Sequence, residues 1–187
     1  MPKPRESFYR PTWMSIALPD AEQLCDELVR QLAGHVGPQT AIVGIVTGGA
    51  WLAERLHRAL APATPLGVLD PSFYRDDFDQ AGLKHQVKPS QIPFDVQGRH
   101  VILVDDVLYT GRTVRGAMNE LFDYGRPAKI ELAVLVDRGG RELPIAARYV
   151  GAKLEVPPGK ILVLERAETG KFTLQLSEKR RERRPTP

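Results

Sequence analysis

Residues 101–113 read Val101-Ile102-Leu103-Val104-Asp105-Asp106-Val107-Leu108-Tyr109-Thr110-Gly111-Arg112-Thr113. The apolar run at the start has the length and composition of a buried parallel strand, and a helical pattern follows the loop. The segment therefore predicts a strand that ends at two carboxylates, then a short turn and a helix start. This order decides the fold, because open α/β sheets bind ligands at the carboxyl ends of their strands.

The loop in this segment suits a phosphorylated sugar. Thr110, Gly111 and Thr113 supply hydroxyls and a close backbone approach at a helix N-terminus, which favours anions. Asp105 and Asp106 are unsuited to phosphate and suit sugar hydroxyls or a hard cation such as Mg²⁺. A strand–loop–helix without any ligand is disfavoured, because buried adjacent carboxylates are costly without a partner. An acid–base role for the pair is an alternative, but we favour substrate and metal positioning.

A second segment has the same organisation. Residues 41–46 form a predicted strand, Thr47-Gly48-Gly49 its loop, and residues 50–60 the next helix. The glycines allow the backbone to approach a second phosphate group, although alone they indicate no more than a tight turn.

The remaining pattern predicts a helix over residues 20–32 and strands over 66–69, 133–136, 161–164 and 172–176. Alternating strands and helices indicate an α/β fold with a twisted, mostly parallel sheet flanked by helices. The loops at 47–50, 105–113 and 137–138 then converge on one edge of the sheet.

Length and charge indicate one domain with a short appendage. The chain has 187 residues, of which 42% are hydrophobic, enough for one domain with a core. We expect that domain over residues 1–178, with a flexible flap at about residues 72–91 and a basic tail at 179–187. Without the tail the chain has 21 basic and 22 acidic residues, so its body is near neutral. The tail is interpreted as a solvated, disordered end, with contact to a polyanion as the alternative.

Cysteine usage and hydropathy predict a cytoplasmic protein that does not enter a membrane. Cys25 is the single cysteine and falls in a helical apolar pattern, which predicts a buried structural thiol without a disulfide. No apolar run has membrane-spanning length, and the first residues lack the apolar segment of a signal peptide.

Residues 101–113 resemble the phosphoribosyl diphosphate (PRPP) motif of the type I phosphoribosyltransferases, because strand, acidic pair and Thr-Gly-x-Thr occur in register. From about residue 40 to 165 the chain resembles the PyrR family. The segments that carry this resemblance are the helix after Gly49 and residues 72–77, 92–96, 101–113, 125–127, 132–139 and 141–145.

The resemblance implies a type I phosphoribosyltransferase core with a small hood, assembled as a homodimer or larger homo-oligomer. It implies two roles for the chain. One is uracil phosphoribosyltransferase activity, which converts uracil and PRPP to UMP and diphosphate with Mg²⁺ as cofactor. The other is UMP-dependent regulation of pyrimidine genes through pyrimidine-operon mRNA.

Candidate site residues follow from the loops and from the resemblance. Asp105, Asp106 and Arg138 are the predicted catalytic residues, and Asp105 and Asp106 are also the predicted Mg²⁺ ligands, directly or through water. Arg138 has a surface ion pair as its alternative role, and Arg75 either closes over the diphosphate or is solvated in the flap. The predicted substrate-binding residues are Thr47, Gly48, Gly49, Arg75, Asp105, Asp106, Val107, Leu108, Tyr109, Thr110, Gly111, Arg112, Thr113, Arg138 and Ile161.

Two departures from the family pattern bear on these roles. Many members read Thr-Arg-Gly in the diphosphate loop, where this chain has Gly48 in place of arginine. RNA-binding members carry basic residues at the positions of Ala146 and Ala152, and their loss weakens phosphate contacts. The alternative hypothesis is therefore a nucleotide-sensing RNA-binding attenuator with weak or no catalysis, and a third is a purine or orotate phosphoribosyltransferase.

Overall fold

The computed structural model describes residues 17–60, 62–74 and 89–178. Its elements are α1 (Ala21–Leu32), β1 (Thr40–Ile45), α2 (Gly48–Leu60), β2 (Leu66–Leu69), the 3₁₀ helix η1 (Pro71–Tyr74), β3 (His100–Leu108), α3 (Arg112–Asp123), β4 (Lys129–Asp137), β5 (Tyr149–Lys153), β6 (Lys160–Arg166) and β7 (Phe172–Glu178).

Five strands form one parallel sheet in the order β2-β1-β3-β4-β5. The register places Val43 opposite Leu103 and Leu103 opposite Leu132. These residues are buried because both faces of the sheet are covered, which is why the central strands are continuous apolar runs. The carboxyl ends of β1, β3 and β4 lie at one edge, so the predicted fold is confirmed.

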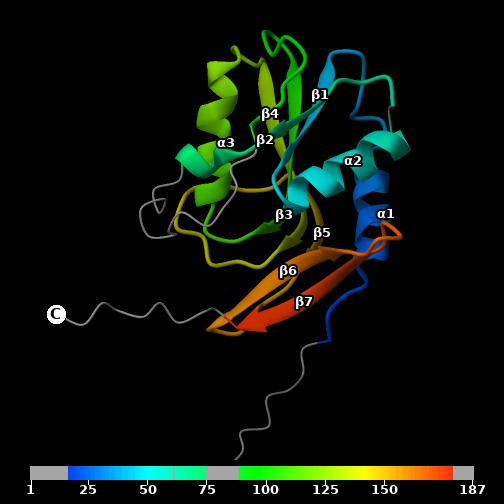
Figure 1. The fold of residues 1–187 in the computed structure, drawn as a ribbon, viewed down its shortest axis with the longest axis vertical. Helices are drawn as coiled ribbons and strands as arrows, with labels where there is room; N and C mark the ends of the chain where they lie inside the picture. Colours follow the sequence, from blue (N-terminus) through cyan, green and yellow to red (C-terminus); the bar gives the residue numbers. More distant parts are fainter. Residues whose placement is uncertain (1–16, 61, 75–88, 179–187) are drawn as a thin grey trace, which may run out of the picture.

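Helices cover the two faces of the sheet separately. Figure 1 shows α1 and α2 on one face and α3 on the other. Helix α1 begins after Asp20, whose side chain accepts the Glu22 N–H at 2.8 Å, and it buries Leu24, Leu28 and Leu32. The stripe predicted from the sequence is therefore the face that α1 packs on the sheet.

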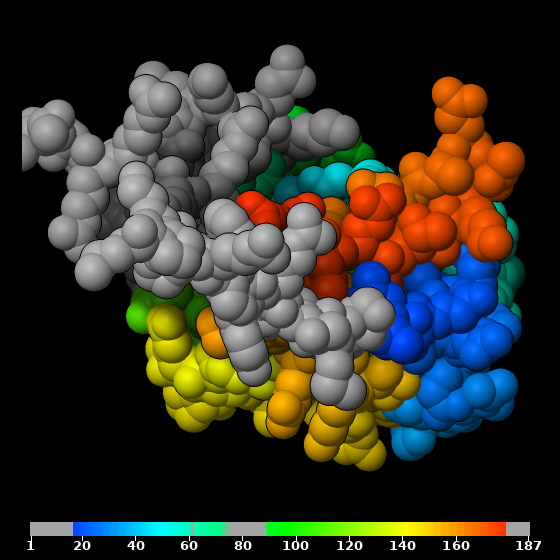
Figure 2. All heavy atoms as spheres, turned by 90° about the horizontal axis from the view of Figure 1, so that it is seen from below, coloured from blue at the N-terminus to red at the C-terminus, as the bar shows by residue number. Residues whose placement is uncertain are grey.

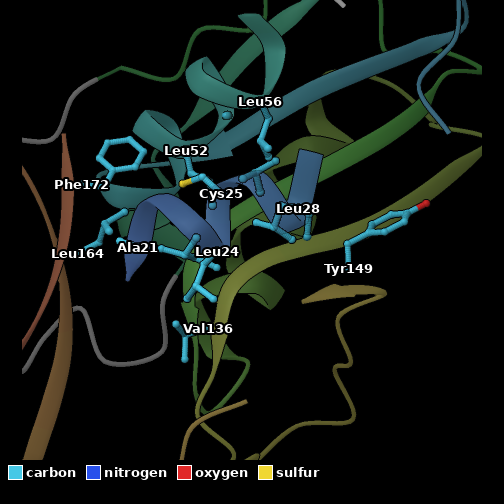
Figure 3. Packing of buried hydrophobic residues seen from close by; sticks show 14 of the residues in the cluster. Ala21, Leu24, Cys25, Leu28, Leu52, Leu56, Val136, Tyr149, Leu164 and Phe172 are labelled. Atoms are coloured by element: carbon cyan, nitrogen blue, oxygen red, sulfur yellow. The ribbon is translucent and has the colours of Figure 1, made fainter. Parts of the chain in front are cut away.

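Cys25 lies inside the core beside α2, close to Leu52 (Figure 3). Burial raises the pKa of its thiol to about 12. Because only the thiolate is a good nucleophile, this cysteine is a packing residue, as predicted.

The last two strands form an antiparallel hairpin, β6–β7, which we call the hood (residues 160–178). Leu162, Leu164, Phe172 and Leu174 are buried at alternate positions, so one face of the hairpin packs on the rest of the molecule. In Figure 2 the hood, orange to red, lies against the blue residues of α1. The predicted late strands are present, and they form the small hood.

Two features of the sheet differ from the expectation. Strand β3 continues past Asp105 and Asp106 to Leu108, because β4 pairs with it as far as Asp137. Strand β5 is not predicted from the sequence, since it is short and contains glycine and alanine. On its outer edge, the Gln31 amide donates to Val150 O at 3.0 Å and accepts the Val150 N–H at 3.1 Å. This side chain replaces the missing neighbouring strand.

Candidate functional site

A pocket of about 980 Å³ opens at the carboxyl edge of the sheet, between the loop after β3 and the hood. It is lined by Asp105, Val107, Leu108, Tyr109, Thr110, Gly111, Arg112, Thr113, Val114, Arg138, Gly140, Glu142, Glu155, Val156, Pro158, Gly159, Lys160 and Ile161. The structure thus brings one predicted strand end, one predicted loop, Arg138 and Ile161 to the same pocket.

The loop from Tyr109 to Gly111 leads into the N-terminus of α3. Gly111 has φ 92°, a left-handed conformation that glycine adopts readily, and its Cβ would lie 3.0 Å from Ile145. The carbonyl of Thr110 accepts the N–H groups of Glu142 and Leu143 at 3.0 and 3.1 Å, which fixes the loop from outside. The N-terminus of α3 therefore lines the pocket, and helix N-termini bind anions through their backbone N–H groups.

The two carboxylates of β3 have different surroundings. Asp105 lines the pocket, is 6% exposed, and accepts the Asp106 N–H at 3.0 Å. Asp106 lies against Gly48 at the start of α2, where its carboxyl group forms a side-chain hydrogen bond with Asp105 and accepts the backbone N–H groups of Val107 and of Leu164 in the hood. Burial raises the pKa of Asp106. Asp105 is therefore the carboxylate that lines the pocket, and Asp106 connects β3 to Asp105 and to the hood.

The predicted diphosphate loop, Thr47 to Gly49, lies beside the acidic pair and outside the pocket lining. Helix α2 begins at Gly48, and a Cβ on Gly49 would stand 2.8 Å from the Asp105 Cα. The Val46–Thr47 peptide bond is cis, and Val46 N donates to Leu69 O at 2.9 Å. The glycines thus let the loop pack directly on β3.

Arg138 forms one wall of the pocket. Its guanidinium carbon lies 4.1 Å from the centre of the Tyr109 ring, and Nη2 donates to the Lys160 carbonyl at 3.2 Å. Its Nε is buried and has no hydrogen-bond partner among the residues that the structure describes. Arg138 is therefore a pocket residue that connects the loop after β3 to the hood, and it forms no ion pair with another residue in the described part of the chain.

Several pocket residues are missing from the sequence prediction. Glu155, Val156, Pro158, Gly159 and Lys160 come from the turn that leads into the hood. The Pro-Pro-Gly sequence at 157–159, which Lys160 separates from Ile161, is the signal that could have found them, since it marks a turn close to a predicted site residue. Val114, Gly140 and Glu142 also line the pocket. Arg75 and most of the predicted flap lie outside the described residues, as does the basic tail.

The donor set at the acidic pair fits Mg²⁺ only in part. Carboxylate oxygens are ligands that Mg²⁺ prefers, and Asp105 presents one carboxylate to the pocket. Within the described ranges no group of three or more His, Cys, Asp or Glu residues could hold a metal. A magnesium ion at Asp105 would therefore take most of its ligands from the substrate and water, as is usual for this ion.

The fold and the pocket are those of a phosphoribosyltransferase. The sequence matches the family Phosphoribosyl transferase domain over residues 15–159. The hypoxanthine-guanine phosphoribosyltransferase of Bacillus anthracis superposes with a TM-score of 0.59 at 22% identity, over 73% of this chain and 82% of that one. The hypoxanthine phosphoribosyltransferase of Trypanosoma cruzi, in a ternary complex with its substrates, gives 0.56 at 25% identity, over 74% and 80%.

Relatives with similar sequences identify the family within the phosphoribosyltransferases. The Bifunctional protein PyrR of Nitrosococcus oceani is 51% identical over 154 residues, which cover 81% of this chain and 87% of the relative. The Bifunctional protein PyrR of Pseudomonas syringae pv. syringae is 46% identical over 164 residues, or 86% and 96%. The chain belongs to the PyrR family, as its sequence motifs predict.

Proposed function

We propose that the protein is a uracil phosphoribosyltransferase that converts uracil and PRPP to UMP and diphosphate. N1 of uracil bonds to the anomeric carbon of the ribose, the bond from that carbon to the diphosphate oxygen breaks, and the N1 proton is released. The observation that carries the proposal is a single pocket formed by the α3 N-terminus, Asp105, Arg138 and the start of the hood at Ile161.

Each part of the pocket has a role in this reaction. The backbone N–H groups at the α3 N-terminus and the hydroxyls of Thr110 and Thr113 hold the 5′-phosphate. Asp105 accepts hydrogen bonds from the ribose hydroxyls, and it would hold Mg²⁺ from its pocket side. That ion, when bound with PRPP, neutralises charge on the leaving diphosphate. The loop from Thr47 to Gly49 holds the diphosphate through its backbone.

Base recognition falls to Arg138 and the hood. The Arg138 guanidinium is held flat by the Tyr109 ring and by the Lys160 carbonyl. Ile161 and Val156 give this end of the pocket an apolar wall. A planar base between these groups is excluded from bulk water, which strengthens its hydrogen bonds. The experiment with three bases distinguishes uracil from the purine and orotate alternatives.

The experiment measures diphosphate release from PRPP and Mg²⁺ with uracil, hypoxanthine or orotate supplied separately. Release with uracil alone is the expected result. Release with hypoxanthine or orotate and none with uracil would replace the proposed substrate. No release with any base from a folded protein that still binds UMP would make the chain a nucleotide sensor.

A second role as an RNA-binding regulator is favoured by the relatives, which are named bifunctional. Two cations near the family's RNA-binding positions are already paired within the molecule. Arg148 lies two residues after Ala146. Its guanidinium pairs with the buried carboxylate of Glu131 at 2.7 Å. Arg141 pairs with Asp137 at 2.6 Å and donates to the Tyr109 carbonyl. Arg141 is mostly buried and therefore offers less to phosphates, whereas the Arg148 side chain stays about half exposed.

The regulatory role is tested by binding of pyrimidine-operon leader RNA at 50 and 200 mM salt, with and without UMP. UMP-dependent binding with a steep salt dependence would support regulation, and no binding at low salt would exclude it. Sedimentation velocity tests the proposed homodimer or larger homo-oligomer. In the described part of the chain, no helix has both the length and the apolar composition needed to cross a membrane. Cytoplasmic localisation remains part of the proposal.

A further inference from the structure

The hood contributes Lys160 and Ile161 to the pocket, yet its strands pair only with each other among the described strands. A short connection, residues 154–159, leads to it from the five-stranded sheet. The position of the hood over the pocket is therefore set by contacts between the hairpin and the body of the protein, rather than by sheet hydrogen bonds. Apolar contacts run along one face of the hairpin, at Leu162, Leu164, Phe172 and Leu174, and polar contacts join it at several points.

At the pocket end, the hood is held by the site itself. Arg138 Nη2 donates to the Lys160 carbonyl at 3.2 Å. The Leu164 N–H donates to the buried carboxylate of Asp106. The first contact fixes β6 where it passes the pocket, and the second lies four residues further along the strand. Each is a single hydrogen bond in a hairpin of seven-residue strands, and neither holds the turn between Arg166 and Phe172.

At the turn end, Glu22 of α1 and Arg55 of α2 hold the hood together. Arg55 Nη1 lies 2.7 Å from Glu22 Oε2, and Arg55 Nη2 donates to the Gly170 carbonyl at 2.8 Å. Glu22 Oε1 accepts the Phe172 N–H at 2.6 Å. Glu22 and Arg55 thus bond to each other and to the hood backbone at Gly170 and Phe172, on either side of Lys171. A salt bridge with added backbone partners is more directional than an isolated pair.

Apolar contacts make the same connection. The Phe172 ring is 2% exposed, and the Arg55 guanidinium carbon lies 4.7 Å from its centre. Figure 3 shows Phe172 and Leu164 of the hood directed toward Leu52 and Cys25 of the helices. Burial acts to raise the pKa of Glu22, but the hydrogen bonds from Arg55 and from the Phe172 N–H outweigh it, so the pKa lies below its usual range. Glu22 is therefore ionised in this contact at neutral pH.

We infer that Glu22 and Arg55 are positioning residues for the base end of the pocket, acting through the β6–β7 hairpin. Arg166 at the anchored end and Lys160 at the pocket end are six residues apart on one strand, on the order of 20 Å. A hairpin released at its turn pivots about its pocket end, and the base wall at Ile161 moves with it. The PRPP loop belongs to β3 and α3 and does not move. This inference rests on the proposed function for the reaction that it affects.

The test compares Arg55→Gln with Arg55→Lys and with Arg30→Gln as control. Arg30 pairs with Glu27 on the exposed face of α1 and does not contact the hood. For the base that the wild type uses, Arg55→Gln is expected to raise KM at least fivefold, while KM for PRPP stays within twofold. Arg55→Lys restores part of the base KM, and Arg30→Gln changes neither constant. Equal rises in both KM values, or an unchanged base KM, would overturn the inference.

Hydrogen exchange measured on the same variants separates this inference from the assignment of the reaction. Arg55→Gln should speed exchange of the amides of residues 160–178 at least fivefold in the free protein, with exchange of residues 101–123 unchanged. This readout needs neither uracil nor turnover, so it stands if the substrate proves different. Unchanged exchange in the hood would show that Glu22 and Arg55 do not hold it. A uniform rise over the whole chain would show only lost global stability, and it would also contradict a positioning role.

Discussion

The carboxylate of Asp106 lies directly against Gly48, where α2 begins. A Cβ on Gly48 would overlap the Asp106 carboxylate and stand 2.9 Å from the Asp106 Cβ. The diphosphate loop therefore packs on the acidic pair with no room for a side chain at this position. This contact gives the departure from the family's Thr-Arg-Gly pattern a structural meaning, because the side chain of an arginine at this position would overlap the Asp106 side chain.

Gly48→Ala is expected to lower kcat/KM for PRPP at least tenfold. The new methyl group must push the loop away from β3, and a displacement of about 1 Å in a positioning group can cost about 10²-fold. Steady-state kinetics with PRPP as the varied substrate measures the effect. Gly37→Ala is the matched control, since nothing lies within 4 Å of its Cβ position. An unchanged KM and kcat for Gly48→Ala would mean that this loop does not touch the diphosphate.

Asp105→Asn and Asp106→Asn should differ in their effects, although the double variant should lose orders of magnitude in turnover. Asp105 faces the pocket, so its neutral variant removes charge from the ribose and the metal and lowers kcat about 100-fold or more. At Asp106, burial raises the carboxyl pKa, and asparagine keeps an oxygen that can accept the Leu164 N–H. Asp106→Asn should therefore keep or raise Tm and lose less turnover. A larger loss for Asp106→Asn would place that carboxylate on the substrate.

The stacked pair of Arg138 and Tyr109 can be separated by its own variants. Arg138→Lys should lower kcat/KM by about tenfold or more, because lysine cannot lie flat on the ring while donating to the Lys160 carbonyl. Tyr109→Phe keeps the ring and should stay within threefold of wild type, whereas Tyr109→Ala should resemble Arg138→Lys. Full activity in Arg138→Lys would show that Arg138 contributes only its positive charge.

The fold could be predicted from the sequence because the patterns that indicate it are local. The apolar runs at 41–46, 101–104 and 133–136 are buried except at Val46, as expected for strands of a parallel sheet that is covered by helices on both faces. The PRPP loop was accessible for the same reason, since strand, acidic pair and helix start adjoin in the chain. Strand β5 was missed because its formation depends on pairing with β4 and on the Gln31 side chain, which is 119 positions from Val150.

The different surroundings of the two carboxylates could not be predicted from the sequence. Asp105 and Asp106 are neighbours in sequence and were assigned the same roles, but alternate side chains of a strand point to opposite faces. Which face became the pocket depends on where the hood and α2 pack. The same long-range packing brings Glu155 and Lys160 into the pocket lining. Local pattern therefore located the site, and tertiary contacts decided which of its atoms are available to a ligand.

Glu131 provides a test at the opposite edge of the sheet. Its buried carboxylate lies 2.5 Å from Lys129 Nζ and 2.7 Å from both His100 Nε2 and Arg148 Nη1. It also accepts a hydrogen bond from the Tyr149 hydroxyl at 3.1 Å. Burial alone would raise its pKa, but the hydrogen bonds from Lys129, His100 and Tyr149 and the charge of Arg148 outweigh it and lower the pKa to about 2. The ionised form is therefore bound more favourably in the folded state.

The pH dependence follows from that direction. A carboxyl whose pKa is lower when folded contributes its stability above the ordinary value of 4.5 and loses it as the pH falls from there toward about 2. At pH 7, Glu131→Gln should cost about 1–3 kcal/mol, because Lys129 and Arg148 are half exposed and water replaces part of the lost interaction. Urea unfolding at pH 7, 5, 4 and 3 measures the difference from wild type, which should shrink steadily below pH 4.5. The exposed Glu54→Gln, which breaks the pair with Arg166, should change stability by less than about 0.5 kcal/mol at pH 7. A Glu131→Gln difference that stays constant down to pH 3 would show that Glu131 stabilises the sheet by packing rather than by its charge.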